Sequence, residues 1–456
     1  MSEVKVNKIS PRTNCGTVQL GDSGDTITIP AGATITNNGT QTGFGRTGAV
    51  DWDTTAKTAS FTAVSGNGYF VNTTSGAITV TMPASPSAGD IVSVSDYAGT
   101  AGTNNITIAR NGSNINGVAS DLTISKNNSA ITLVYVDGTQ GWKGTETSNL
   151  NDIEIQPEYI VATGGTVTCC GDYKIHTFTS PGTFTVSSVG NCLGSEAVDY
   201  LVIAGGGGGG GICGGGGGGA GGYRESSGVA SGCYTASPLG ACVSALPVSA
   251  QGYPVTVGGG AAGAAPCGNN NADGGQGNNS SFSTITSTGG GGGGAFQRSG
   301  STGGSGGGGG GRGSTPGSAG NTPPVSPPQG NSGGGSTPSP ANPDRGGGGG
   351  GATASGSTAS SQGGAGGTAA TSHITGSPVA RAGGGGGGWD TGLTPAPTTG
   401  GGGAGGVTCG VTNVDGAAGT SGTGGGGGGA GGGYPTGQGQ GGNGGNGIVI
   451  IRYKYQ

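Results

Sequence analysis

Hydrophobic and polar residues alternate in short stretches through the first third of the chain. Ile78, Val80 and Met82 alternate with threonines, and residues 104–110 and 121–125 repeat this pattern. A period of two is typical of a β-strand with one buried face. The same reasoning places strands at residues 60–64, 68–72, 90–97 and 130–137. Short strands about ten residues apart predict a β-sandwich or jelly roll, here over residues 46–150.

Residues 1–45 show a thinner version of the same pattern. Val18 and Leu20, then Ile27 and Ile29, alternate with polar residues between turn-forming stretches. A strand this short and one-sided cannot bury its face alone. We therefore expect a β-stalk formed by threefold association of identical chains, which would also dock the protein. A flexible arm that becomes ordered on docking is the alternative.

Strand-like stretches continue after residue 150, first in 151–204 and then among long glycine tracts. They occur at residues 199–204, 253–259, 281–287 and 447–455. We interpret them as one β-framework from which the glycine-rich segments depart. The last strand is expected to return and close this framework beside residues 199–204.

Glycine is the most abundant residue in residues 205–456. Of the 119 glycines, 94 follow residue 200. The uninterrupted runs are residues 205–211, 214–219, 289–294, 306–311, 346–351, 383–388, 400–403 and 424–429. Six of these eight runs are six residues long, and a flexible linker needs no fixed length. The repeated length therefore indicates a repeated geometry.

Extended threefold helices of the polyproline-II type suit such runs, because glycine is poor in α-helices and has no side chain to pack in strands. Six residues rising about 3.1 Å each would span roughly 19 Å. Packed side by side, such helices can bond their backbone N–H groups to neighbouring carbonyls. We predict a bundle of polyglycine-II helices beginning at Gly205, Gly214, Gly289, Gly306, Gly346, Gly383 and Gly424. A disordered tether is the alternative.

The polar segments between the runs are expected to be exposed loops held by this bundle. They carry prolines, which limit loop freedom, and aromatic residues, which are favoured anchors in binding surfaces. A rigid scaffold that presents loops is a common design for recognition. The candidate contact residues are Tyr234, Pro323, Pro338, Trp389 and Tyr434. Solvated connections without a partner are the alternative.

Charge and hydropathy narrow the choice of partners. Residues 1–200 carry a net charge of −7 and residues 201–456 carry +2, and no basic stretch indicates nucleic-acid binding. No run approaches the ~20 apolar residues of a membrane span. The first residues lack the apolar segment of a signal peptide, so we expect synthesis in a cytoplasm without membrane insertion.

Catalytic and metal-binding chemistry is not indicated by the sequence. The two histidines, His176 and His373, lie far apart and outside metal-binding motifs. Matches to GxSxG and GxGxxG arise by chance in glycine-rich sequence. The nine cysteines include no CxxC pair, so we expect mainly reduced thiols, with a Cys233–Cys242 disulfide as the alternative. No catalytic, cofactor or metal residue is assigned.

Three parts of the chain resemble bacteriophage appendage proteins. The segment DYLVIAGGGGGG…YPVTVGGG…GGNGIVIIRYKY resembles the glycine-rich domains of tail fibres and related virion proteins. The stretch GYFVNTTSGAITVTMPASPSAGDIV looks like a β-module of structural proteins in marine and cyanobacterial phages. The first residues are similar to fibre shafts. This resemblance implies a homotrimer, and in adhesins of this type a polyglycine-II bundle carries loops that contact the host.

The expected protein is thus an all-β, non-enzymatic tail fibre located on the virion. Its first residues would dock to another virion protein, and its glycine-rich tip would bind a bacterial surface glycan or outer-membrane protein. A head fibre, neck appendage or capsid decoration without receptor binding is the second hypothesis. A polysaccharide depolymerase is the third, because paired carboxylates cannot be recognised from sequence.

Overall fold

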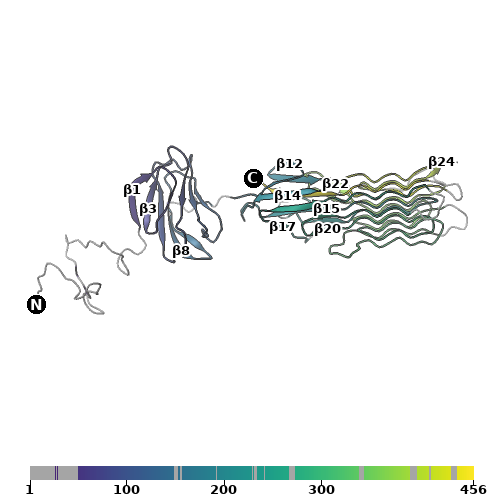
Figure 1. Ribbon diagram of the computed structural model, residues 1–456, viewed down its shortest axis with the longest axis horizontal. Helices are drawn as coiled ribbons and strands as arrows, with labels where there is room; N and C mark the ends of the chain where they lie inside the picture. The colour runs from purple at the N-terminus through teal and green to yellow at the C-terminus, as the bar shows by residue number, and fades with distance from the viewer. Residues whose placement is uncertain are drawn as a thin grey trace, which may run out of the picture. The chain divides into compact units, whose positions relative to one another are not determined.

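The computed structural model is all-β (Figure 1), with one short 3-10 turn, η2 (Pro238–Gly240), among the described residues. It describes Thr26, Thr28 and residues 50–147, 153–154, 157–191, 193–228, 230, 234–240, 242–266, 273–337, 344–390, 398–409, 412–432 and 439–456. These residues form two compact units. The first takes residues up to 118 and 124–152, and the second takes residues 119–123 and 153–456. The stalk expected at residues 1–45 lies almost entirely outside the described residues.

The first unit is a sandwich of two sheets. One sheet has the order β1-β3-β5-β8-β9, formed by β1 (Asp51–Lys57), β3 (Asn67–Val71), β5 (Ile91–Asp96), β8 (Ala130–Asp137) and β9 (Gly141–Thr147). The other has the order β7-β6-β4-β2, formed by β7 (Leu122–Ile124), β6 (Ile106–Ala109), β4 (Ile78–Thr81) and β2 (Phe61–Thr62). Ile78, Val80 and Met82 are buried as predicted from their alternation, while the threonines between them are partly exposed.

The second unit begins with another pair of sheets, which we call the framework sandwich. One sheet has the order β11-β14-β18-β19-β20, formed by β11 (Val161–Thr163), β14 (Gly182–Ser188), β18 (Gly252–Thr256), β19 (Ser280–Phe282) and β20 (Ile285–Ser287). The other has the order β12-β13-β25-β15-β16, formed by β12 (Thr166–Cys170), β13 (Tyr173–Phe178), β25 (Ile448–Lys454), β15 (Ala197–Ile203) and β16 (Tyr223–Glu225). The short strands of this unit are β10 (Ile153–Glu154), β17 (Leu246–Pro247), β21 (Ala370–Ser372), β22 (Val379–Arg381), β23 (Thr408–Cys409) and β24 (Thr412–Asn413).

The C-terminal strand closes the framework beside residues 199–204, as predicted. In β25, Ile450 pairs with Leu201 of β15 on one side, and Ile451 pairs with His176 of β13 on the other. Both faces of β25 are buried. Val449 and Ile451 face the core between the two sheets, whereas Ile448 and Ile450 belong to a second cluster with residues of the β21–β22 hairpin. The apolar run of β25 therefore fits a strand covered on both sides.

From this sandwich the glycine segments run side by side (Figure 1). We call them rods, and together they form the glycine bundle. Successive amides of one rod donate to different neighbours. Gly206 donates to Gly445, Gly207 to Gly219 and Gly208 to Gly275, at 2.9, 2.9 and 3.0 Å. One turn later the pattern repeats, because Gly209 donates to Gly442 of the first neighbour and Gly210 to Gly216 of the second. This three-residue period is that of a threefold extended helix.

The carbonyl groups of the same rod accept hydrogen bonds from three further rods. Gly205 accepts from Gly290, Gly206 from Ala261 and Gly207 from Gly427. The rod of residues 205–211 is thus bonded to six neighbours, and the backbone polar groups of residues 205–210 are all hydrogen-bonded although the rod is fully buried. The predicted ordered bundle is confirmed, and the alternative of a disordered tether is wrong for the described glycine runs.

The bundle contains more rods than the uninterrupted glycine runs predict. Residues 312–345 and 351–381 were expected to be exposed loops, but parts of both are rods in the hydrogen-bonded lattice of the glycine bundle. Ser318 donates to Gly307, Gly333 to Ser318 and Gly356 to Ser332. A rod at the rim of the lattice needs glycine only where it faces inward. In residues 439–447, Gln440, Asn443 and Asn446 are exposed at every third position.

Candidate functional site

The rods reverse direction at the end of the bundle away from the framework sandwich, where Figure 1 labels β24. We call this end the tip, and its described residues are 212–213, 273, 295–299, 312–314, 344–345, 360–362, 389–390, 407–408 and 414–415. Hydrogen bonds tie its turns together. Gln297 donates its backbone N–H to Gly311 at 3.0 Å, and Gly311 donates to Gly214 at 2.9 Å. The turns are therefore extensions of the lattice.

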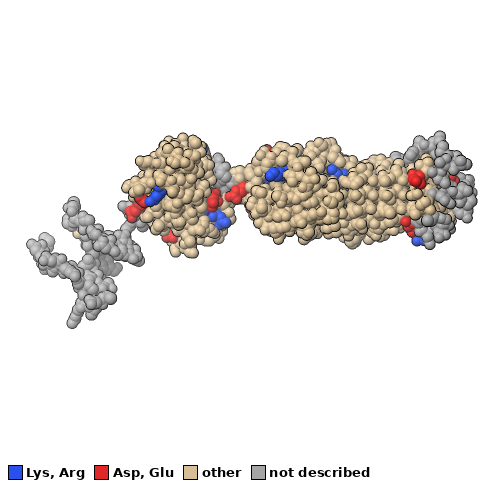
Figure 2. Space-filling model, turned by 45° about the horizontal axis from the view of Figure 1, so that its top comes forward, with Lys and Arg blue, Asp and Glu red and all other residues tan. Residues whose placement is uncertain are grey.

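Charged side chains of the described bundle gather at the tip. They are Asp273, Arg298, Arg312, Asp344, Arg345, Asp390 and Asp415. The described rod positions between the tip and the framework sandwich carry no charged side chain. On the face drawn in Figure 2, the stretch of the bundle between its two ends is tan, without the red or blue of charged residues. The charged side chains of the described bundle are thus concentrated where the rods turn.

One side of the tip combines an ion pair with an apolar cluster. Arg298 Nε lies 2.9 Å from Asp273 Oδ2, and the other carboxylate oxygen of Asp273 accepts the backbone N–H of Ala295 at 2.8 Å. The Arg312 guanidinium lies 5.6 Å from the ring centre of Phe296. Below it, Phe296 packs with Ile212 and Cys213. Exposed ion pairs add little stability, so the Asp273–Arg298 pair contributes little to the stability of the tip.

The thiol of Cys213 is buried beneath this surface. Burial, followed by the nearby Asp344 and Asp390 carboxylates, raises the pKa of Cys213 to about 12, and the opposing effect of Arg312 is smaller. At neutral pH the thiol stays protonated and is a poor nucleophile. Cys213 therefore acts as a small apolar residue under the tip.

Trp389 is held on another side of the tip by backbone contacts. It forms an antiparallel bridge with Arg345 and a parallel bridge with Val407. Its backbone N–H donates to the carbonyl of Gly406 at 3.1 Å, and the backbone N–H of the next residue, Asp390, donates to the carbonyl of Asp344 at 3.0 Å. Trp389 is partly exposed, while its indole Nε1 is buried. Burial raises the pKa of the Asp390 carboxyl.

The residues that the sequence proposed as receptor contacts lie in different parts of the structure. Trp389 lies at the tip, but Tyr234 packs against the framework core, with its ring 5.1 Å from the Arg452 guanidinium. Pro323 is exposed in a turn at the sandwich end of the bundle, where its carbonyl accepts from Gln329 Nε2 at 3.1 Å. Tyr434 and Pro338 lie outside the described residues.

Sequence reasoning missed Arg298, Arg312 and Phe296 as tip residues. A signal for them exists, because Arg312 directly follows one glycine run, and Phe296 and Arg298 come shortly after another that ends at Gly294. Charged and aromatic side chains are rare in this segment, so their occurrence near the end of a glycine run indicates that the rod ends there and the chain turns.

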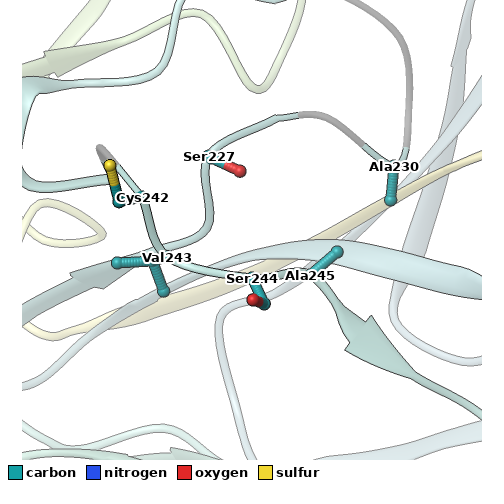
Figure 3. A pocket seen from close by; sticks show the side chains of 6 residues that line it. All are labelled: Ser227, Ala230, Cys242, Val243, Ser244 and Ala245. Carbon is teal, nitrogen blue, oxygen red and sulfur yellow. The ribbon is translucent and has the colours of Figure 1, made fainter.

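A separate pocket of about 410 Å³ is lined by residues between β16 and β17 (Figure 3). Its described lining consists of Ser227, Ala230, Cys242, Val243, Ser244 and Ala245. The thiol of Cys242 is free and exposed, so the structure does not contain the considered bridge to Cys233, which lies outside the described residues. Small neutral side chains give this pocket little capacity for acid–base chemistry.

The described part of the chain contains no cluster of three or more histidine, cysteine or acidic residues that could hold a metal ion. No helix within it is long and apolar enough to cross a bilayer. Buried carboxylates outside the tip are bonded internally. Glu225, for example, accepts from the Tyr223 hydroxyl at 2.9 Å and from the backbone of Ser237 at 2.9 Å.

Comparison with known proteins identifies one match. A family model described as a glycine-rich domain matches residues 179–454. The matched range begins just before β14 and ends with β25, so it takes in both the bundle and most of the framework sandwich. No curated protein matches the chain.

Proposed function

The chain belongs to the glycine-rich domain family, and from the geometry of that domain we propose that it is a non-enzymatic attachment protein of a virion. In this proposal the protein is a bacteriophage tail fibre, and the tip of its glycine bundle binds a receptor on the bacterial surface. It works by binding alone and needs no cofactor.

The observation that carries the proposal is the lattice behind the tip. The rod of residues 205–211 bonds to six neighbours, so the turns at its end start from fixed backbone positions. A rigid scaffold that presents side chains in turns loses little conformational entropy on binding. Charged and aromatic groups lie at the tip, whereas the sides of the bundle offer small neutral residues.

Two further elements of the proposal come from the resemblance to phage fibres. The protein associates as a homotrimer, and residues 1–45 dock it to another virion protein. The receptor is a bacterial surface glycan or an outer-membrane protein. Trimerisation would multiply weak tip contacts, because linked sites gain affinity through effective concentration.

The proposal is tested by competition for adsorption. Purified full-length protein, added to host cells before the phage, is expected to reduce adsorption. Replacement of the tip turns 295–298, 312–314 and 389–390 by those of a phage with another host should abolish the competition. The matched control replaces the exposed Pro323 turn, residues 322–328, at the sandwich end, and this variant should still compete.

Other results would support one of the two alternative functions. If tip and control variants compete equally, or if antibody against the tip labels particle heads without reducing adsorption, the protein is a decoration or neck appendage. Shortening of host polysaccharide on incubation with the protein would instead support a depolymerase.

A further inference from the structure

The first unit carries three aromatic side chains on the outer face of one sheet. The rings of Trp52 and Phe70 are stacked with centroids 4.8 Å apart, and Phe70 meets Tyr97 edge to face at 6.5 Å. Trp52 is 43% exposed and Tyr97 59% exposed. We call these residues the aromatic patch. Exposed aromatic clusters of this kind mark interaction sites, because single apolar residues are normal on a surface but clusters are rare.

The strand register fixes the surroundings of the patch. Trp52 of β1 lies opposite Gly68 of β3, Gly68 opposite Ser93 of β5, and Ser93 opposite Thr132 of β8. A Cβ on Gly68 would lie 2.7 Å from the indole. Glycine at this position therefore lets the Trp52 ring lie over the sheet.

Small hydroxyl side chains continue the row beyond the indole. Ser93 and Thr132 are bonded to each other through their hydroxyl groups at 2.8 Å. Thr132 lies opposite Glu146 of β9, whose carboxylate is exposed at the far side of the sheet. Ser93 is buried, so the polar groups that this face exposes beyond the indole are the partly exposed Thr132 and the Glu146 carboxylate on the opposite edge strand.

Charge decides which occupant this face suits. The described residues 50–147 carry seven acidic and four basic side chains. Asp53 lies beside Trp52 on the edge strand, with its charge partly offset by Lys57 at 2.6 Å. An acidic unit disfavours nucleic acid and acidic polysaccharide, and it disfavours the same face of a second copy because like charges would meet.

We propose that the aromatic patch binds a neutral saccharide. The apolar C–H faces of sugar rings lie on the exposed Trp52 and Tyr97 rings. An oligosaccharide that extends across the sheet donates hydroxyl groups to Glu146 on the opposite edge strand. This site is separate from the tip and does not depend on receptor binding there. It would give the protein a second, weaker attachment to glycan.

The test uses the full-length protein and neutral oligosaccharides of glucose, galactose, mannose and N-acetylglucosamine. The chain has three tryptophans, so their indole N–H resonances can be followed separately by NMR during titration. The Trp52 signal is expected to shift with a neutral saccharide, while the signal of the buried Trp142 stays in place. Trp52→Ala should weaken binding on the order of 10-fold or more, since aromatic anchors dominate binding surfaces.

Two controls keep the result interpretable. Val136→Ser removes an exposed apolar side chain from β8 of the same sheet and should leave binding unchanged. Trp52→Tyr keeps an aromatic ring and should retain most of the affinity. The inference is overturned if no neutral saccharide moves the Trp52 signal, or if only acidic ones do. A change of oligomeric state in Trp52→Ala would show instead that the patch joins copies of the chain.

Discussion

A Cβ atom added to Gly207 would lie 2.1 Å from the carbonyl oxygen of Gly291 in the neighbouring rod. Carbon and oxygen cannot approach this closely, and the oxygen belongs to a backbone that is itself bonded on all sides. The same holds for Gly206 against Gly425 and for Gly208 against Ala262, each at 2.1 Å. Glycine is therefore required at interior positions by contact with the next backbone.

Gly207→Ala is expected to destabilise the second unit by about 3 kcal/mol or more, because the methyl group must push two rods apart and lengthen their hydrogen bonds. Gly259→Ala is the matched control, since the nearest atom to its added Cβ is 3.7 Å away. This change should leave the folded state unaffected or stabilise it by up to about 1 kcal/mol, because alanine lowers the conformational entropy of the unfolded chain. Urea unfolding of both variants measures the difference, and equal midpoints would contradict the lattice.

The rim of the bundle is completed by side-chain amides. Asn443 Oδ1 accepts the N–H of Gly263 at 2.8 Å, and Asn446 Oδ1 accepts the N–H of Gly260 at 2.9 Å. Changing both asparagines to alanine should increase hydrogen exchange at Gly260 and Gly263 by roughly 5- to 10-fold, as one neutral bond is lost at each. Changing both to aspartate keeps an acceptor and should preserve most of the protection. Unaltered exchange in the alanine variant would refute the role of these amides.

The framework sandwich should lose stability in mild acid because of His176. The ring is buried, with Nδ1 2.7 Å from the Gly164 carbonyl and Nε2 3.1 Å from the Tyr453 hydroxyl. Burial lowers its pKa below the ordinary 6.5. Below pH 6.5 the unfolded chain takes up a proton that the folded chain does not, so stability falls until the folded pKa is reached.

Thermal unfolding at pH 8 and pH 5 checks this expectation. The wild type should lose more stability between these values than His176→Gln, which keeps a hydrogen-bonding side chain without a titrating ring. The difference between the two proteins isolates His176 from the carboxylates, which titrate in both. An identical pH dependence would remove His176 as a source of the effect.

Cys213 provides a chemical probe of the tip. Its thiol is buried and its pKa is about 12, whereas Cys169 and Cys242 are exposed. Maleimide at neutral pH should label Cys169 and Cys242 within minutes and Cys213 on the order of 100-fold more slowly. Mass spectrometry of the peptides measures this. Phe296→Ala should speed labelling of Cys213 by opening the cluster above it, while rapid labelling in the wild type would mean that the tip is not packed as described.

Local sequence pattern was sufficient where side chains alternate. Ile78, Val80 and Met82 were placed on one face because a strand has a period of two, and the apolar residues 447–455 were predicted to form a strand that closes the framework beside residues 199–204. The rim rods were missed because their signal is a three-residue repeat. In residues 439–447 the exposed Gln440, Asn443 and Asn446 follow this repeat, but alternation and uninterrupted glycine do not detect it.

By itself the sequence determined that the long glycine runs pack through their backbones, since chains without side chains can approach closely and must bond to each other when buried. Only the tertiary structure decided which rods are neighbours, and hence that Trp389 lies at the tip while Tyr234 lies against the framework. The physical reason is that every glycine rod offers the same donors and acceptors. Order in the lattice is set by the closing strands and turns, whose contacts join residues far apart in the chain.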